Sequence, residues 1–251
     1  MNKAFWAAMG LVAVGIAPAL AADLPARTYS KAPAIIAAVY DWSGFYIGLN
    51  GGGASSRECY TVFSVAGAAV NPNSEGCHSA TGAVAGGQIG YRWQASSWVF
   101  GIEGQGDWAN LKGSNASLTA VVPYTNQTKI NSIGLFTGQI GYTWNSVVLY
   151  LKGGAAVTNN SYSSFFTATG VAFNQASDTR WGGAVGTGIE FGFAPNWSVA
   201  LEYDHLFMGN PSVTFPATAN AVTRSDNIRQ GVDMGTVRVN YRFGGPVIAK
   251  Y

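Results

Sequence analysis

The sequence predicts an all-β fold, an eight-stranded antiparallel up-and-down transmembrane β-barrel, and three observations predict it. Charged residues make up 10% of the 251 residues, well below the ~25% of soluble proteins. Eight segments alternate large apolar residues with small or polar ones, which is the period of a strand. The connectors between these segments alternate between short and long, as in barrels that cross membranes.

The eight predicted strands are about ten to fourteen residues long, which suits a tilted crossing of a bilayer. They are residues 44–54, 81–93, 97–109, 130–144, 147–158, 180–193, 197–208 and 231–243. Three connectors are short enough for tight turns, namely 94–96, 145–146 and 194–196. The others are expected to be long polar loops, and strict alternation places them all at one end: 55–80, 110–129, 159–179 and 209–230.

Odd-numbered and even-numbered residues of each strand lie on opposite faces of the barrel wall, so the residue pattern assigns the two faces. In the last strand Val237 and Val239 share one face, and Arg238 and Arg242 share the other. The apolar face carries almost no charge along all eight segments, as lipid demands, since Arg or Lys at mid-bilayer costs ~2–4 kcal/mol. A soluble ligand-binding barrel would instead turn its apolar face inward.

Aromatic residues beside the short turns predict a girdle at one membrane interface. Its members are Trp93, Trp98, Trp144, Phe193, Trp197 and Phe243. A thinner ring at the opposite interface comprises Trp108, Trp181, Tyr203 and Phe207.

The inward face predicts a lumen filled by charge pairs. An eight-stranded barrel is just wide enough for side chains to fill, and an unpaired charge in that space would be costly. Arg238 is expected near Glu202 or Asp204, whereas Arg224 is expected in the fourth long loop, outside the network. Inward glycines such as Gly90 leave a narrow, water-filled path open as an alternative. The predicted network is Arg92, Glu103, Asp107, Lys152, Glu190, Glu202, Asp204, Arg238 and Arg242.

The N-terminus predicts a secretory signal peptide over residues 1–22. Lys3 supplies the positive start, an apolar stretch follows, and small residues precede cleavage after Ala21 or Ala22. Residues 23–41 are expected to form a periplasmic linker, 42–243 the barrel and 244–251 a C-terminal tail. No later segment is apolar for long enough to form a transmembrane helix.

Two cysteines, Cys59 and Cys77, lie in the first long loop. In an oxidising compartment they are expected to form a disulfide. The alternative is a metal site with His78, for which the ligand spacing is irregular. We expect no cofactor and no metal.

The segment Asp41-Trp42-Ser43-Gly44-Phe45-Tyr46-Ile47-Gly48, the linker Asp23-Leu24-Pro25-Ala26-Arg27 and the ending Tyr241-Arg242-Phe243 resemble the small outer-membrane barrels of alphaproteobacteria. These are surface-antigen proteins filed as a porin family and related to opacity proteins and the OmpA barrel. The resemblance implies an outer-membrane location. It also implies that Val239, Tyr241 and Phe243 form an assembly signal, although Gly244 to Tyr251 follow it.

Three classes of function are considered for a barrel of this kind. The first is a structural barrel that displays surface loops with its lumen plugged, the second is a narrow low-conductance porin, and the third is an enzyme. Catalytic groups that converge at one place are lacking, so an enzyme is not expected. The expected partners are outer-membrane lipid and the barrel-assembly machinery, with lipopolysaccharide or a host surface at the long loops. Nucleic acid is not expected, since the net charge is +2 and no basic run occurs.

Overall fold

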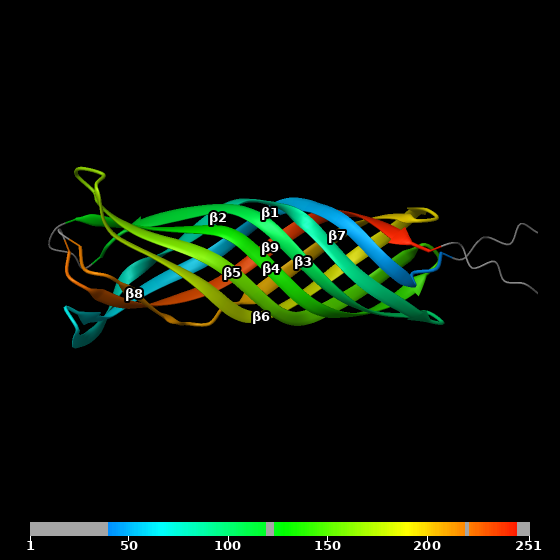
Figure 1. Ribbon diagram of the computed structural model, residues 1–251, viewed down its shortest axis with the longest axis horizontal. Helices are drawn as coiled ribbons and strands as arrows, with labels where there is room; N and C mark the ends of the chain where they lie inside the picture. The colour runs from blue at the N-terminus through cyan, green and yellow to red at the C-terminus, as the bar shows by residue number, and fades with distance from the viewer. Residues whose placement is uncertain (1–39, 119–122, 219–220, 245–251) are drawn as a thin grey trace, which may run out of the picture. The chain divides into compact units, whose positions relative to one another are not determined.

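The computed structural model describes residues 40–118, 123–218 and 221–244, which form a closed antiparallel β-barrel (Figure 1). The predicted signal peptide and residues 23–39 of the predicted linker lie outside the described residues, as do residues 245–251 of the predicted tail. The strands are β1 (Gly44–Val65), β2 (Ala68–Ala95), β3 (Trp98–Ala116), β4 (Tyr124–Trp144), β5 (Val147–Phe166), β6 (Ala172–Ala194), β7 (Trp197–Phe207), β8 (Ser212–Phe215) and β9 (Arg224–Phe243).

Each strand pairs with its neighbours in chain order, and β1 closes the ring by pairing with β9. The short strand β8 pairs with β9 beyond the end of β7, so β7 and β8 are two parts of one wall position. The ring therefore has eight positions, as the sequence predicts. Within the described ranges no helix has the length and hydropathy needed to cross a membrane.

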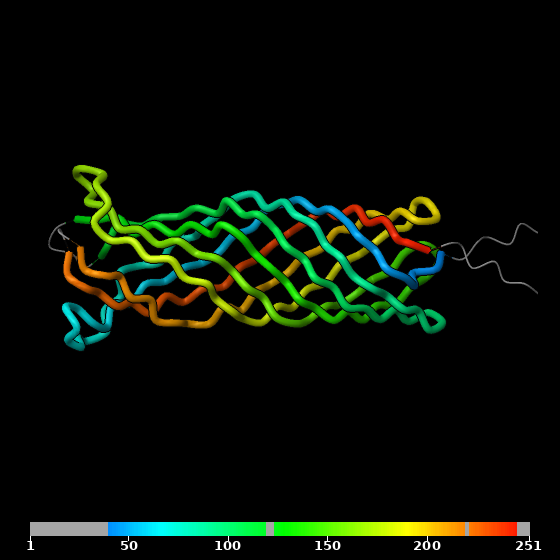
Figure 2. Tube along the Cα trace, viewed as in Figure 1, coloured from blue at the N-terminus to red at the C-terminus, as the bar shows by residue number. Residues whose placement is uncertain are grey.

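Short turns gather at one end of the barrel and long hairpins at the other (Figures 1 and 2). The short turns leave out only two residues between strands, at 96–97, 145–146 and 195–196, close to the predicted turns. Ser96 and Asn145 open two of them with positive φ values of 57° and 55°. Such turns match the twist of paired strands.

The wall is strongly sheared. A row of paired residues that leaves β1 at Phe45 returns to β1 at Ser55, ten residues nearer the long-hairpin end. The row runs through Tyr91, Ile102, Gly138, Gly153, Val185, His205 and Asp233. This offset corresponds to a strand tilt of roughly 40°, so each residue advances about 2.5 Å along the barrel axis.

The predicted long loops are mostly strand. The pairing of β1 with β2 continues to Val65 and Ala68, where Ala66 and Gly67 make the turn with positive φ. The loops predicted at 110–129, 159–179 and 209–230 are likewise reduced to 117–123, 167–171 and two short breaks around β8. Outside the bilayer both faces of a strand accept polar residues, so the apolar alternation disappears while the hydrogen-bonded ladder continues.

The two aromatic rings mark the part of the wall that lies in the membrane. Trp98 and Trp108 face outward on β3, and Trp197 and Phe207 face outward on β7. Each pair is ten residues apart, about 25 Å along the axis, which equals the apolar band of outer-membrane barrels. The strands continue beyond the second ring as a long extension at the long-hairpin end.

Candidate functional site in the barrel lumen

The predicted charge network exists as a group of ion pairs across the lumen. Arg238 of β9 donates to Glu103 of β3 and to Glu202 of β7. The Lys152 Nζ lies 2.7 Å from Glu202 Oε1 and 3.1 Å from Asp204 Oδ1. All of these side chains are fully buried. The pairs therefore tie four separate strands together through the centre of the barrel.

Two tyrosines complete the carboxylate contacts. The Tyr46 hydroxyl donates to Glu103 Oε2 over 2.6 Å, and the Tyr150 hydroxyl donates to Glu202 Oε2 over 2.6 Å. Inward glycines make room for these rings, since a Cβ at Gly90 would collide with Tyr46 and one at Gly188 with Tyr150. At these positions the space that the glycines leave is therefore occupied by aromatic side chains.

A second pair lies nearer the short turns. The Arg92 Nη1 lies 2.7 Å from Glu190 Oε2, and its Nε donates to Gln139 Oε1 over 3.1 Å. The guanidinium also lies 4.7 Å from the Tyr46 ring centroid and 5.4 Å from that of Tyr150. This stacking adds cation–π attraction to the ion pair and fills the cross-section at this level.

Two residues of the predicted network face inward without joining it. Asp107 accepts a hydrogen bond from Gln105 over 2.8 Å and forms no ion pair within the described part of the chain. Arg242 donates to the carbonyls of Ser43 and Pro195 over 3.0 and 2.9 Å. The prediction that Arg242 pairs with an acid is wrong, because it lies at the rim, where turn carbonyls are nearer than carboxylates.

The short-turn end is closed by Trp42. Its ring is buried against Val99, Val148 and Tyr150, and its Nε1 donates to Thr143 Oγ1 over 2.8 Å. The residue that was expected to begin the barrel thus inserts into its mouth. The ring of Tyr40 packs on it with centroids 4.5 Å apart.

An apolar layer that the sequence predictions do not include follows the charges toward the long-hairpin end. Its side chains point inward from all eight wall positions, with Met208 just beyond the end of β7, and each is at most 8% exposed: Ala54, Ala80, Val84, Leu111, Ile130, Ile133, Leu135, Ala156, Ala184, Leu206, Met208, Val232 and Met234. The signal was present in the sequence, since most of these apolar residues share the odd or even positions of the inward charges on their strands; Ile130 departs from this pattern because a bulge precedes Ser132. A packed apolar layer offers water few hydrogen-bond partners at this level of the lumen.

A second buried charge cluster lies in the extension. Arg224 pairs with Asp226 at 2.6 Å and with Glu75 at 3.2 Å. Arg224 lies outside the network of Arg238, as expected, but the prediction that it lies in a long loop is wrong, because residues 224–230 are part of β9 and turn alternate side chains inward. Burial raises the pKa of Asp226 to about 6 against the opposing effect of Arg224.

Glu58 lies in the same extension and is fully buried. Burial raises the pKa of its carboxyl to about 7, although the Ser56 hydroxyl donates to Oε1 over 2.7 Å and Arg180 lies nearby. A carboxyl of this kind favours its neutral form inside the folded protein.

The cysteines and His78 lie on opposite faces of the extension. Cys59 and Cys77 are paired residues of β1 and β2, joined by a disulfide on the outer wall. His78 points inward, with its ring nitrogens 2.8 Å from Asn115 Oδ1 and 3.1 Å from Thr128 Oγ1. Burial lowers the pKa of this histidine. The described residues hold no group of His, Cys, Asp or Glu that could bind a metal ion.

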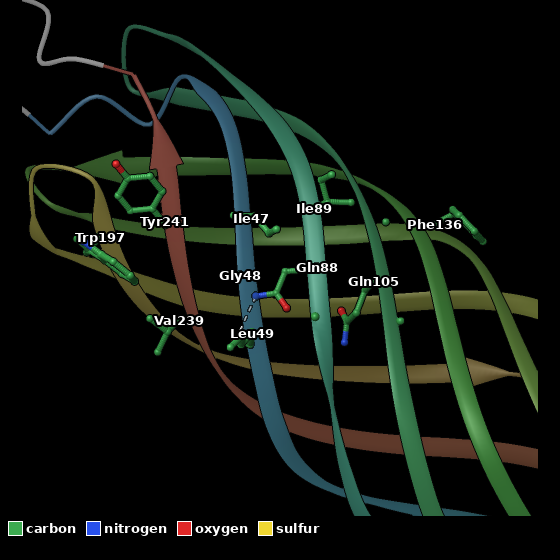
Figure 3. A pocket seen from close by; sticks show the side chains of 13 residues that line it. Ile47, Gly48, Leu49, Gln88, Ile89, Gln105, Phe136, Trp197, Val239 and Tyr241 are labelled. Carbon is green, nitrogen blue, oxygen red and sulfur yellow. Dashed lines mark hydrogen bonds between the residues drawn. The ribbon is translucent and has the colours of Figure 1, made fainter.

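A hollow of about 750 Å³ lies on the outer wall within the membrane band (Figure 3). Ile47, Leu49, Ile89, Phe136 and Val239 surround outward glycines there. Lipid chains cover such a surface in a membrane. The polar lumen lies behind this wall, so the hollow supplies no chemistry of its own.

The chain belongs to the outer membrane protein beta-barrel domain family, whose model matches residues 7–243. It is 28% identical over 232 residues to the 31 kDa outer-membrane immunogenic protein of Brucella melitensis biotype 1, covering 90% of this chain and 93% of the relative. It is 26% identical to the 25 kDa outer-membrane immunogenic protein of Brucella abortus biovar 1, covering 90% and 92%. The protein is therefore a small outer-membrane barrel of the alphaproteobacterial kind, located in the cell outer membrane.

Solved structures of similar fold include OprG of Pseudomonas aeruginosa, at 13% identity and a TM-score of 0.49 over 80% of this chain and 97% of that one. Another is the attachment invasion locus protein Ail of Yersinia pestis, at 17% identity and a TM-score of 0.36 over 79% and 99%. Outer-membrane β-barrels in general place short turns in the periplasm and long loops outside, and we therefore call the long-hairpin end extracellular.

Removing Arg238 tests the energetic weight of the lumen pairs. Arg238→Met leaves Glu103 and Glu202 without their main partner, so unfolding in detergent should become easier by ~3–5 kcal/mol. Adding Glu103→Gln and Glu202→Gln should recover much of that loss, because the stranded charges are gone. The matched control, Val237→Ala, changes the neighbouring lipid-facing residue and should cost under about 1.5 kcal/mol. Equal losses of stability in the Arg238→Met and Val237→Ala variants would contradict a stabilising role for the ion-pair network.

Glu58 predicts how stability depends on pH. Its folded pKa of about 7 lies above its ordinary value of 4.5, so the folded state binds the proton more tightly. The stabilisation is therefore fully present below about pH 4.5 and is lost as the pH rises through 7; it is on the order of 3 kcal/mol. Thermal unfolding at pH 5 and pH 8 should show a smaller difference in Glu58→Gln than in the wild type. A larger difference in the variant would refute the assignment.

Proposed function

We propose that this protein is a closed, non-conducting barrel that anchors an extracellular β-extension in the outer membrane. The lumen holds three successive closures: the ring of Trp42, the ion pairs around Arg238 and the apolar layer around Leu135. The apolar layer carries the proposal most directly, because ions cross a dry apolar constriction poorly. A narrow porin would need an open polar path past all three.

The extension supplies the surface that a display function requires. Strands β1 and β2 continue far beyond the outer aromatic ring, and the Cys59–Cys77 disulfide joins them there. The buried charges of Arg224, Asp226 and Glu75 hold the inside of this extension. The two Brucella relatives are named immunogenic proteins, which supports a role in presenting a stable surface rather than in catalysis or transport.

Assembly by the barrel-assembly machinery belongs to the same proposal. Val239 and Phe243 face outward on β9, and Tyr241 lies between them with the same parity. The Phe243 ring packs beside Phe45 of β1 with centroids 5.6 Å apart, where the barrel closes. We propose that this outward trio is the signal that the machinery reads.

Conductance of the refolded protein in a planar bilayer tests the closed lumen. The wild type should give no steady current steps, because the apolar layer remains dry. Arg238→Met should also stay closed, since it leaves that layer intact. A double variant, Leu135→Gly with Met234→Gly, hollows the layer and should pass more current than either.

One outcome would decide against the closed lumen. A steady unit conductance in the wild type would favour the narrow porin instead. The control is Leu149→Gly with Leu201→Gly, two lipid-facing positions on β5 and β7; this variant should remain as silent as the wild type. Folding of each variant is checked by its faster migration when unheated on a detergent gel.

A further inference from the structure

The outer wall of the extension carries charge of almost one sign. Four bases face outward and are exposed there: Arg57, Lys112, Lys129 and Arg229. Among the described outward positions of this end, the one carboxylate is Asp233, which accepts hydrogen bonds from Tyr203 and lies 2.7 Å from His205 Nδ1. The remaining acids of the described extension face the interior. The wall thus presents uncompensated positive charge to its surroundings.

The four bases lie at nearly one height. Lys112 is four residues beyond Trp108 on β3, about 10 Å further along the axis. Lys112 pairs with Thr81 of β2, which in turn pairs with Ser55 of β1. Because the strands are sheared, following this pairing from β3 to β1 moves between two and three residues toward the short-turn end of the barrel. Arg57, two residues beyond Ser55, is therefore level with Lys112.

The other two bases follow from direct pairing. Lys129 of β4 is the paired residue of Lys112. Arg229 of β9 pairs with Cys59, and Gly231 pairs with Arg57, so the two arginines are diagonal neighbours. The four positions fall within about 5 Å of one height. They form an arc over β9, β1, β2, β3 and β4, which we call the basic arc.

The arc is unfavourable without a partner. Like charges directly opposite each other on paired strands repel, and this is the arrangement of Lys112 and Lys129. Within the described part of the chain none of the four bases forms an ion pair. Hydroxyl groups stand between and beside them at outward positions, on Ser79, Thr81 and Ser161. Bases with interleaved hydroxyls suit phosphate groups on a sugar.

The depth of the arc identifies the partner. The polar headgroup region reaches ~5–8 Å beyond the hydrocarbon on each side. The arc lies about 10 Å beyond Trp108, and long basic side chains can reach back toward the membrane along the wall. We propose that the basic arc binds the phosphate groups of a phosphorylated glycolipid of the outer leaflet. The inference rests on the outer-membrane location and is independent of whether the lumen is closed.

Binding of lipid A by the full-length protein in zwitterionic detergent tests this proposal. The probes are lipid A that carries both phosphates and the same lipid with the phosphates removed. Native mass spectrometry and a fluorescence titration should show at least tenfold tighter binding of the phosphorylated form. A variant with Arg57, Lys112, Lys129 and Arg229 all changed to Gln should lose this preference. Added salt should weaken the wild-type binding.

A matched control lies at the same height on the other half of the barrel. Asn159→Gln with Thr179→Gln changes exposed neutral residues of β5 and β6 and should bind as the wild type does. A second readout separates binding from folding. Without lipid A, Lys129→Gln should melt at the same temperature as the wild type or higher, because the repulsion with Lys112 is relieved. With lipid A, the wild type and the matched control should gain stability, and the quadruple variant should not.

Three results would overturn the proposal. Equal wild-type binding of both lipid forms would mean that phosphate is not recognised. Unchanged phosphate preference in the quadruple variant would place the site elsewhere. Tighter binding of a soluble sulfated oligosaccharide than of lipid A, lost in the same variant, would assign the arc to a polyanion in solution rather than to the membrane.

Discussion

The structure depends on one constraint: the lumen of an eight-stranded barrel has room for side chains and little else. Every inward residue must therefore find its partner across the barrel or in the layer above or below. The ion pairs of Arg238 show the consequence, because its guanidinium joins β9 to β3 and β7 through the centre. Glycines on one strand are matched by tyrosines from its neighbour, as at Gly90 and Tyr46. The size of each inward residue of the wall therefore depends on the side chain that packs against it in the lumen.

The side chains that fill the lumen change from charged to apolar and back to charged and aromatic along the barrel axis. Charges lie where lipid surrounds the wall, and most of them form ion pairs across the lumen. The apolar layer around Leu135 lies toward the outer leaflet. The extension then returns to buried charge and aromatic rings, among them Arg224 and Tyr60. Its outer surface faces headgroups and water, which explains why the bases excluded from the lipid band appear there.

Lipid is also the reason that much of this could be predicted from the sequence. Within the membrane band the outward face must be apolar, so parity placed Arg92, Glu103 and Arg238 inside correctly. Beyond the band this constraint ends. Neighbours such as Ser56 and Arg57 are both polar although one faces inward and the other outward, and no alternation reveals the strand. The basic arc is likewise hidden, since only the register of five strands gathers residues so distant in sequence.

Accessibility of single cysteines along β9 tests the central claim, a lipid-clad wall around a filled lumen, most directly. In a background with Cys59 and Cys77 changed to Ser, cysteines at residues 236–240 are exposed in vesicles to a membrane-soluble maleimide and to a small charged one. Positions 237 and 239 should react with the membrane-soluble reagent alone, and positions 236, 238 and 240 should react with neither. Reaction of the even positions with the charged reagent would show an open aqueous lumen and contradict the account.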